Sequence, residues 1–183
     1  MPTEPKIAHE QADAESCITT FNWLTDDIAV GGCFPIERAA ELGREHGVGA
    51  VVDLRAEDCD DPAQLAAAGL TFLHLPTPDM EPASVAMLEA GVDFARERLA
   101  CGEKVLIHCQ HGIGRSALLA LCVMVDQGWA PLEALSQAKD RRAVISPSPS
   151  QFRGWVRWLE QRGVAAPDFH TFGCIAYRHL ANG

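Results

Sequence analysis

The chain has 183 residues, 48% of them hydrophobic and 22% charged, so it can bury a core as a single globular domain. Its formal net charge of −10 argues against nucleic acid or an anionic membrane surface as a general partner. No apolar run approaches the ~18 residues of a membrane span. We expect a protein that works without nucleic acid and without a membrane.

The cysteines favour a reducing compartment. Their number is odd, and they form neither a CxxC pair nor a regular spacing, so a disulfide framework or a cysteine zinc site is not indicated. The first residues also contain no apolar stretch of signal-peptide type. We therefore expect a cytoplasmic location. The seven cysteines are Cys17, Cys33, Cys59, Cys101, Cys109, Cys122 and Cys174.

The amino-terminal part divides into an arm and the start of a folded domain. Residues 1–15 are acidic and lack periodicity, which predicts a loose arm. Residues 16–32 contain two short apolar runs, Ile18–Trp23 and Ile28–Val30, separated by turn residues, and this pattern predicts a hairpin. We place one folded domain over residues 16–163, followed by a carboxyl-terminal tail over residues 164–183.

The next residues alternate between predicted helices and strands. Pro35–His46 reads as a helix that Gly47 ends, and Val48–Leu54 as a buried strand. Asp61–Ala68 reads as a short helix and Thr71–Leu75 as a strand. This order is typical of an α/β domain with a central, mainly parallel sheet flanked by helices. Arg55, just beyond its strand, could add charge to a ligand site or pair with Asp53 or Glu57, and the pairing is the preferred interpretation.

A proline-rich segment follows. Residues 76–82 hold three prolines, which predicts a loop because proline interrupts helices and sheets alike. Beyond it, apolar residues at helical spacing predict an amphipathic helix that Gly102 ends. These residues are Val85, Leu88, Val92, Ala95 and Leu99.

The stretch from Lys104 to Ser116 contains the strongest functional signal. A short apolar strand ends in a glycine-rich loop, and an apolar run from Ala117 to Val125 continues it as a helix. Backbone amides converge at such a loop and bind anions, phosphate above all. Cys109 opens the loop and Arg115 closes it, so the curled loop would bring a thiol and a guanidinium together.

Each residue type in this loop suits phosphate chemistry. Amides and the helix dipole favour the thiolate form of a cysteine, which is the nucleophile. The planar fork of Arg115 can hold two phosphoryl oxygens, and Gly112 and Gly114 permit a close backbone approach. Backbone amides from the loop would complete the phosphate site, contributed by Gln110, His111, Gly112, Ile113, Gly114 and Arg115.

After the central helix, the pattern predicts a second helix beyond Pro131 and a last helix that carries Phe152, Trp155 and Leu159. A loop over Ser146–Gln151 precedes the last helix. The tail contains His170, Cys174 and His179, but without a fourth ligand these do not indicate zinc. We expect no metal.

The loop sequence, HCxxGxGRS over residues 108–116, resembles the signature of the cysteine-dependent protein tyrosine phosphatases, and most closely that of their compact dual-specificity branch. The resemblance covers residues 18–163, although only the loop is specific. It implies a single α/β domain with the phosphate loop between a strand and the central helix. It also implies hydrolysis of phosphomonoesters through a phosphocysteine intermediate, without a cofactor.

The resemblance also assigns roles outside the nucleophile. Family members protonate the leaving oxygen with an aspartate from a separate loop, and Asp79 lies thirty residues before Cys109 in the proline-rich segment. It could instead cap the following helix. Ser116 would donate a hydrogen bond to the sulfur, His108 would support the loop, and Gln151 would position water.

The loop sequence admits other interpretations. A dinucleotide site needs an acid about twenty residues on, at the end of a second strand, where the sequence here reads as helix. An ATP-type loop needs Gly-Lys-Ser/Thr, which does not follow. A buried inert cysteine is a further alternative. A phosphopeptide-binding pseudophosphatase and a rhodanese-like sulfurtransferase remain as the functional alternatives.

The substrate expectation rests on the variable positions of the loop. Gln110, His111 and Ile113 add no lysine for extra phosphates. We expect a phosphotyrosine protein or a small phosphomonoester as substrate, with phosphoserine and phosphothreonine as further candidates, in preference to a phosphoinositide.

Overall fold

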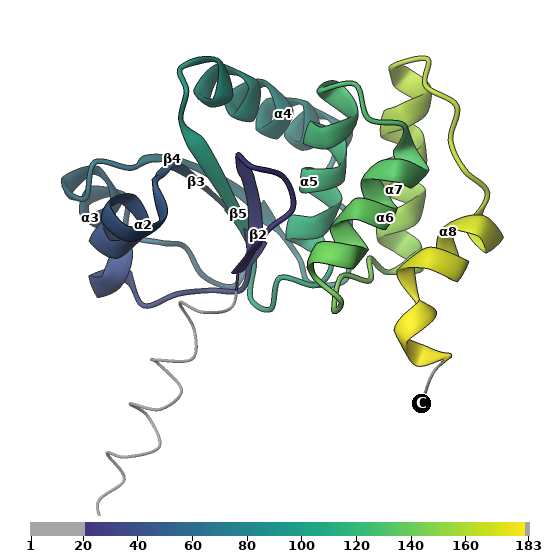
Figure 1. Ribbon diagram of the computed structural model, residues 1–183, viewed down its shortest axis with the longest axis horizontal. Helices are drawn as coiled ribbons and strands as arrows, with labels where there is room; N and C mark the ends of the chain where they lie inside the picture. Colours follow the sequence, from purple (N-terminus) through teal and green to yellow (C-terminus); the bar gives the residue numbers. More distant parts are fainter. Residues whose placement is uncertain (1–20, 182–183) are drawn as a thin grey trace, which may run out of the picture.

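The structure, a computed structural model, describes residues 21–181 (Figure 1). The expected arm over residues 1–15 lies outside this range, as does the start of the first expected strand. Strands β1 (Phe21–Trp23) and β2 (Ile28–Gly31) pair antiparallel, which confirms the predicted hairpin in its described part.

The sheet has five strands in the order β1-β2-β5-β3-β4. Apart from the β1–β2 pair, neighbouring strands are parallel. The predicted α/β class with a mainly parallel sheet is therefore confirmed. The remaining strands are β3 (Val48–Arg55), β4 (Thr71–Thr77) and β5 (Lys104–His108).

Helices cover both faces of the sheet (Figure 1). On one face lie η1 (Ile36–Arg38), α2 (Ala39–His46) and α3 (Pro62–Ala67). On the other lie α4 (Val85–Ala100), α5 (Arg115–Asp126), α6 (Pro131–Arg141) and α7 (Pro149–Gln161), with α8 (Phe169–Ala176) and η2 (Arg178–Leu180) beside α6.

The middle strand β5 shows why both faces need cover. Val105 and Ile107 belong to the larger apolar cluster with α5, whereas Leu106 belongs to the smaller cluster with α2. Successive side chains of a strand point to opposite faces, so an unbroken apolar strand fits only between two helical layers. Helix α5 is buried from Arg115 to Met124, and it lies directly on the sheet.

The carboxyl ends of the parallel strands meet at one edge of the sheet. Residue His108 is in register with Asp53 on one side and with Gly31 on the other. Open α/β sheets bind ligands beyond this edge. The segments after β3, β4 and β5 therefore converge on one place.

Two elements differ from the sequence-based expectation. Strand β4 extends through Pro76 to Thr77, where a loop was predicted. Proline is tolerated because β4 is an edge strand, so its missing amide costs no ladder hydrogen bond. Residues 169–176 form helix α8, where no element was predicted.

Helix α8 is fixed to the domain by aromatic packing and by the residues after it. Phe172 is fully buried against Phe152 and Trp155. The Tyr177 hydroxyl donates to the Pro147 carbonyl at 2.6 Å. Helix α8 and Tyr177 therefore pack on the same core as the rest of the domain.

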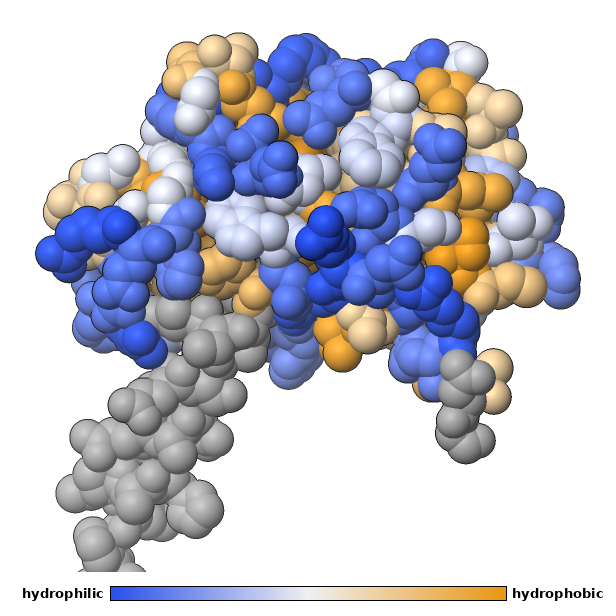
Figure 2. Space-filling view, viewed as in Figure 1, coloured by the Kyte–Doolittle hydropathy of each residue, from blue (hydrophilic) through white to orange (hydrophobic). Residues whose placement is uncertain are grey.

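The surface of the molecule is mostly polar. The face in Figure 2 is largely hydrophilic, with smaller hydrophobic areas over the helices on its right-hand side. Among the described helices, none combines the length and the apolar character needed to cross a membrane.

Candidate active site

The phosphate loop, residues 109–115, connects the end of β5 to the start of α5 and curls around the Cys109 sulfur. Cys109 is 3% exposed, and its Sγ lies 3.3 Å from both the Ser116 hydroxyl and the Gly112 amide. A small cavity opens above the sulfur. Its lining includes Asp79, Met80, His111, Ile113, Arg115 and Gln151.

Two glycines make this curl possible. Gly112 has φ of +66°, and a Cβ there would lie 2.4 Å from the Gly31 backbone. At Gly114 a Cβ would lie 2.4 Å from the Gln151 side chain. A side chain at Gly112 would force the loop open, whereas one at Gly114 would displace the Gln151 amide.

The environment of Cys109 favours its thiolate. Burial by itself would raise the pKa of the thiol, but a hydrogen bond with the Ser116 hydroxyl and hydrogen bonds from the Ser116, Gly112 and His111 amides lower it below its ordinary value. The thiolate is the reactive form of cysteine. Ser116 therefore lies where the sequence analysis predicted, in contact with the sulfur.

Arg115 is held by one edge of its guanidinium group. Nη1 donates to Glu57 and to the Thr77 carbonyl, and Nη2 donates to the other oxygen of Glu57, at 2.7 to 2.8 Å. Nε is buried and has no hydrogen-bond partner. Because the guanidinium has two bidentate edges, this arrangement leaves the Nε edge for an oxyanion.

Glu57 was not predicted as a site residue. The hydrogen bond from Arg115 lowers the pKa of Glu57 to about 2, so its carboxylate stays ionised at any ordinary assay pH. Its place two residues beyond β3, at the sheet edge that binds ligands, was the available sequence signal.

We expect Glu57→Gln to lower kcat/KM for an aryl phosphate about fivefold. A charged hydrogen-bonded pair contributes ~1.5–3 kcal/mol, and exposure reduces this to about 1 kcal/mol here. The Glu57 side chain is 44% exposed. Asp58→Asn is the matched control, because that neighbouring carboxylate contacts Arg55. Equal kinetics for the two variants would contradict a positioning role for Glu57.

Asp79 lies at the mouth of the cavity. One carboxylate oxygen is 3.5 Å from Nη2 of Arg115, and the side chain is 66% exposed. Next to it, Met80 has φ of +65°, which is unusual for a residue with a side chain. The alternative role as cap of α4 is filled by Ser84, which accepts the Met87 amide.

Residues that follow α6 in the chain hydrogen-bond to both the phosphate loop and the Asp79 loop. Arg142 donates to the Gly112 carbonyl at 2.8 Å and to the His111 carbonyl at 3.0 Å. The Ser148 hydroxyl donates to the Met80 carbonyl at 2.6 Å. Sequence analysis did not identify Arg142 as a site residue, because its contacts span 30 residues or more.

Gln151 lies beside the cavity, but both ends of its amide have protein partners. Its Oε1 accepts the Ser148 amide at 2.8 Å, and its Nε2 donates to the Glu81 carbonyl at 3.3 Å. The first of these contacts, together with the Gln151 amide donating to the Ser148 hydroxyl at 3.1 Å, forms a capping box at the start of α7. The side chain of Gln110 donates to the Cys33 sulfur at 3.4 Å.

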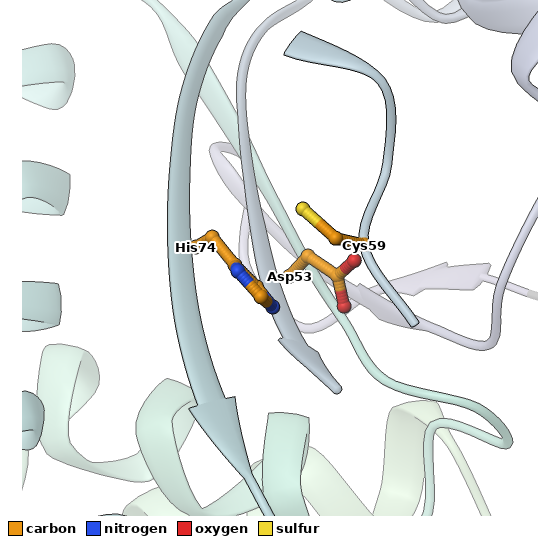
Figure 3. Close-up of side chains that lie close together, drawn as sticks. All are labelled: Asp53, Cys59 and His74. Carbon is orange, nitrogen blue, oxygen red and sulfur yellow. The ribbon is translucent and has the colours of Figure 1, made fainter. Parts of the chain in front are cut away.

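Two groups of side chains could be compared with metal sites. Asp53, Cys59 and His74 lie close together (Figure 3), and Asp53, Asp60 and His108 form a second, buried group. Arg55 donates to both oxygens of Asp53. A cation at either place would have to displace this guanidinium, so we assign no metal to them. Of the two acids expected as partners of Arg55, Asp53 is the one that pairs with it, whereas Glu57 pairs with Arg115.

Comparison with known proteins agrees with this geometry. Residues 30–129 match a family of DSP-PTPase phosphatases described from polymorphic toxin systems. Mouse phosphatidylglycerophosphatase and protein-tyrosine phosphatase 1 is 35% identical over 95 residues, which cover 51% of this chain and 49% of that protein. Dual specificity protein phosphatase 1-B of Xenopus laevis is 33% identical over 96 residues, 51% of this chain and 26% of that protein. The chain thus spans at most about half the length of these relatives.

Solved structures extend the match. The active form of Tk-PTP superposes with a TM-score of 0.70 at 26% identity, over 78% of this chain and 97% of that one. PTPMT1 in complex with PI(5)P superposes with a TM-score of 0.72 at 24% identity, over 77% and 95%, and shows the shared fold. The matched residues carry the thiolate loop, its arginine and the central helix, and on these grounds the chain belongs to the dual-specificity phosphatase branch of the cysteine-dependent protein tyrosine phosphatases.

Proposed function

We propose that the protein hydrolyses phosphomonoesters through a phosphocysteine intermediate. One observation carries the proposal: the Cys109 sulfur is surrounded by hydrogen-bond donors and lies beside an arginine whose Nε is buried without a partner. A buried donor without a partner is costly, and an oxyanion over the sulfur would satisfy it. A pseudophosphatase that only binds phosphopeptides needs no nucleophile, whereas this site has both the cysteine and the arginine.

In the first step the Cys109 thiolate attacks phosphorus in line with the leaving oxygen. The S–P bond forms as the P–O bond to the leaving group breaks, and Asp79 transfers its proton to that oxygen. Loop amides and the Nε edge of Arg115 stabilise charge on the equatorial oxygens, which is the main catalytic contribution in phosphoryl transfer.

In the second step water attacks the phosphocysteine. Asp79, now ionised, accepts a proton from the water, the S–P bond breaks, and inorganic phosphate leaves. The hydroxyl of Ser116, 3.3 Å from the sulfur, stabilises the departing thiolate. None of these steps requires a metal or an organic cofactor.

The cavity mouth favours an aryl phosphate. Met80 is 61% exposed and Ile113 is 39% exposed, and both line the cavity. An aromatic ring between them would bury apolar surface. The Asp79 carboxylate lines the same mouth and would repel further phosphates. We therefore propose phosphotyrosine as the preferred substrate class, with phosphoserine and phosphothreonine as further candidates.

A phospholipid is the second candidate, because a relative is named a phosphatidylglycerophosphatase and PTPMT1 was solved with PI(5)P. We expect kcat/KM for a phosphotyrosine peptide to exceed that for PI(5)P by at least about tenfold, since like charges at the mouth oppose a headgroup with several phosphates. Both substrates are assayed at one ionic strength. A preference for PI(5)P would move the protein to the lipid phosphatases.

A chromogenic aryl phosphate tests the reaction class itself. We expect turnover of this substrate and none of thiosulfate, which a sulfurtransferase would use. Sulfur transfer with no release of phosphate would overturn the proposal.

We also propose a reducing compartment such as the cytoplasm. Cys59, Cys101, Cys109, Cys122 and Cys174 are free thiols, and the mechanism requires Cys109 to remain one. Fractionation of the native protein would test the location.

A further inference from the structure

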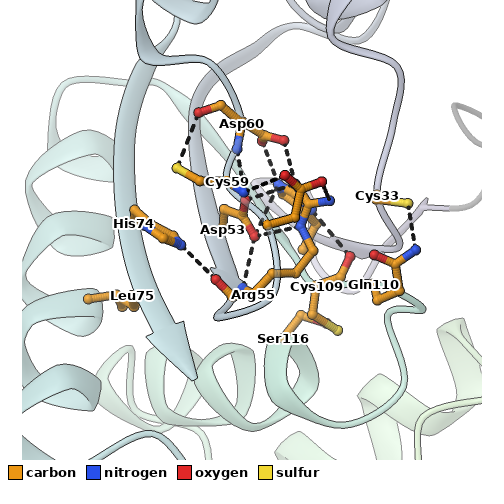
Figure 4. Close-up of polar contacts among 12 residues, drawn as sticks. Cys33, Asp53, Arg55, Cys59, Asp60, His74, Leu75, Cys109, Gln110 and Ser116 are labelled. Carbon is orange, nitrogen blue, oxygen red and sulfur yellow. Dashed lines mark hydrogen bonds and ion pairs between the residues drawn. The ribbon is translucent and has the colours of Figure 1, made fainter. Parts of the chain in front are cut away.

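A buried cluster of charged side chains lies beneath the phosphate loop, between β3 and β5 (Figure 4). Arg55 donates to Asp53 at 2.9 and 3.0 Å and to Asp60 at 2.8 Å. His108 Nε2 lies 2.7 Å from the other oxygen of Asp60. All four residues are at most 5% exposed.

The charges of this cluster determine the state of His108. Among the buried groups, two carboxylates face one guanidinium, so these groups are neutral together only if His108 is a cation. Asp58 also contacts Arg55, but it is 65% exposed and its charge is solvated. An uncompensated buried charge costs several kcal/mol, which favours the imidazolium. Asp60 and Asp53 face the ring at 2.7 and 3.9 Å, Arg55 contributes an opposing positive charge, and Phe34 packs against the ring edge.

The hydrogen-bond geometry of His108 also favours the imidazolium. Its Nε2 faces the Asp60 carboxylate, and its Nδ1 faces the Cys109 carbonyl at 3.3 Å. Both partners are acceptors, so both ring nitrogens need a proton to make these contacts. Burial opposes this charge, but Asp60 and then Asp53 raise the pKa of His108 above its ordinary value.

The bond to the Cys109 carbonyl matters for the anion site. In a planar trans peptide the carbonyl and the following amide point in opposite directions. When His108 holds the Cys109 carbonyl beneath the loop, the Gln110 amide is directed to the opposite side, where the phosphate oxygens would lie.

We propose that Asp60 is a positioning residue that keeps His108 doubly protonated, so that His108 fixes the first peptide of the phosphate loop for oxyanion binding. This deepens the proposed function and rests on it. The sequence analysis assigned His108 a supporting role and assigned Asp60 none.

Asp60→Asn tests the proposal through its pH dependence. The asparagine oxygen must face Arg55, which donates to one oxygen of Asp60, so the asparagine NH2 group faces Nε2 and His108 becomes neutral with its proton on Nδ1. The contact with the Cys109 carbonyl then loses its charge assistance, and the cation beneath the loop is lost. We expect the variant to bind inorganic sulfate about tenfold more weakly than its reference near pH ~8. The difference should shrink towards unity below pH ~6, because a histidine without its carboxylate partner regains its ordinary pKa of ~6.5 and protonates.

The measurement is made in a Cys109→Ser background for both proteins, so that titration of the thiol contributes nothing. Sulfate keeps its charge over this pH range. The effect of any titrating group that both proteins share cancels in the ratio of their dissociation constants. Asp58→Asn is the matched control. Asp58 also accepts from Arg55, at 3.0 Å, but its side chain is 65% exposed and does not contact His108.

An equal affinity, or a loss of affinity that is the same at every pH, would overturn the proposal, since a merely structural defect has no histidine titration. If Asp60→Asn does not fold, nitrogen NMR of His108 in the otherwise native chain decides. We expect both ring nitrogens to carry protons near pH ~8, and a neutral ring there would refute the inference.

These readouts do not depend on turnover. If the protein does not hydrolyse aryl phosphate but has a doubly protonated His108 and binds sulfate, the proposed reaction is wrong and the role of Asp60 is retained. If the protein hydrolyses aryl phosphate but His108 is neutral near pH ~8, the proposed reaction is retained and the role of Asp60 is wrong.

Discussion

Replacing Cys109 with serine should lower turnover of an aryl phosphate by about 10⁵-fold, a loss comparable to that seen when other enzymes lose their nucleophile. A serine hydroxyl at this position is not ionised at neutral pH, whereas the loop amides and Ser116 lower the pKa of the Cys109 thiol. Steady-state hydrolysis and trapping of a phosphoenzyme would measure the effect. Activity near the wild-type level would exclude the phosphocysteine mechanism.

Oxyanion binding should survive this substitution. The amides of the loop and the free edge of Arg115 remain in place, so sulfate or phosphate should bind Cys109→Ser with an affinity within a few fold of wild type. Arg115→Lys supplies the contrast. An ammonium cannot bind Glu57 and an oxyanion through two separate edges, so this variant should lose affinity and rate together.

The second large effect is expected for Asp79→Ala, which should lower kcat by about 10²–10⁴, the usual contribution of a positioned general acid. The loss should be smallest for substrates with acidic leaving groups, because these need little protonation. A series of aryl phosphates of graded leaving-group pKa, assayed with both proteins, would show this as a steeper dependence in the variant.

Glu81→Ala is the matched control for Asp79. Glu81 lies in the same loop, and its carboxylate accepts from the Ser150 hydroxyl at 3.0 Å. The control should keep most of its activity. If Asp79→Ala hydrolyses phosphotyrosine as fast as wild type, the acid lies elsewhere. Asp53 is then no candidate, because it is fully buried and both of its oxygens bind Arg55.

The nucleophile loop could be predicted from the sequence because its determinants are local. Cys109, two glycines and Arg115 lie within one strand–loop–helix unit, and short spacing along the chain dictates what the curled loop brings together. The Ser116 contact with the sulfur was implied by the family resemblance, and the structure places the two atoms 3.3 Å apart. Asp79 was predicted because its loop resembles the acid loop of the family, and the structure places its carboxylate 3.5 Å from Arg115.

Secondary structure could be predicted where the apolar residues of a segment follow a single helical or strand periodicity. The buried strands and amphipathic helices follow from apolar spacing. Pro76 misled the prediction, since whether proline interrupts a strand depends on whether that strand lies at the sheet edge, which is a property of the sheet and not of the segment. Helix α8 was missed because its stability comes from packing Phe172 against distant aromatic residues.

The groups that hold the nucleophile loop were decided only by the tertiary structure. Glu57 meets Arg115 across 58 residues, Asp60 meets His108 across 48, and Arg142 meets Gly112 across 30. An isolated acidic or basic residue carries no signal for such a partner, because the same side chain is equally suited to solvent. Parallel strand pairing brings the ends of β3 and β5 together, and burial there makes a charge stable only when it has a partner.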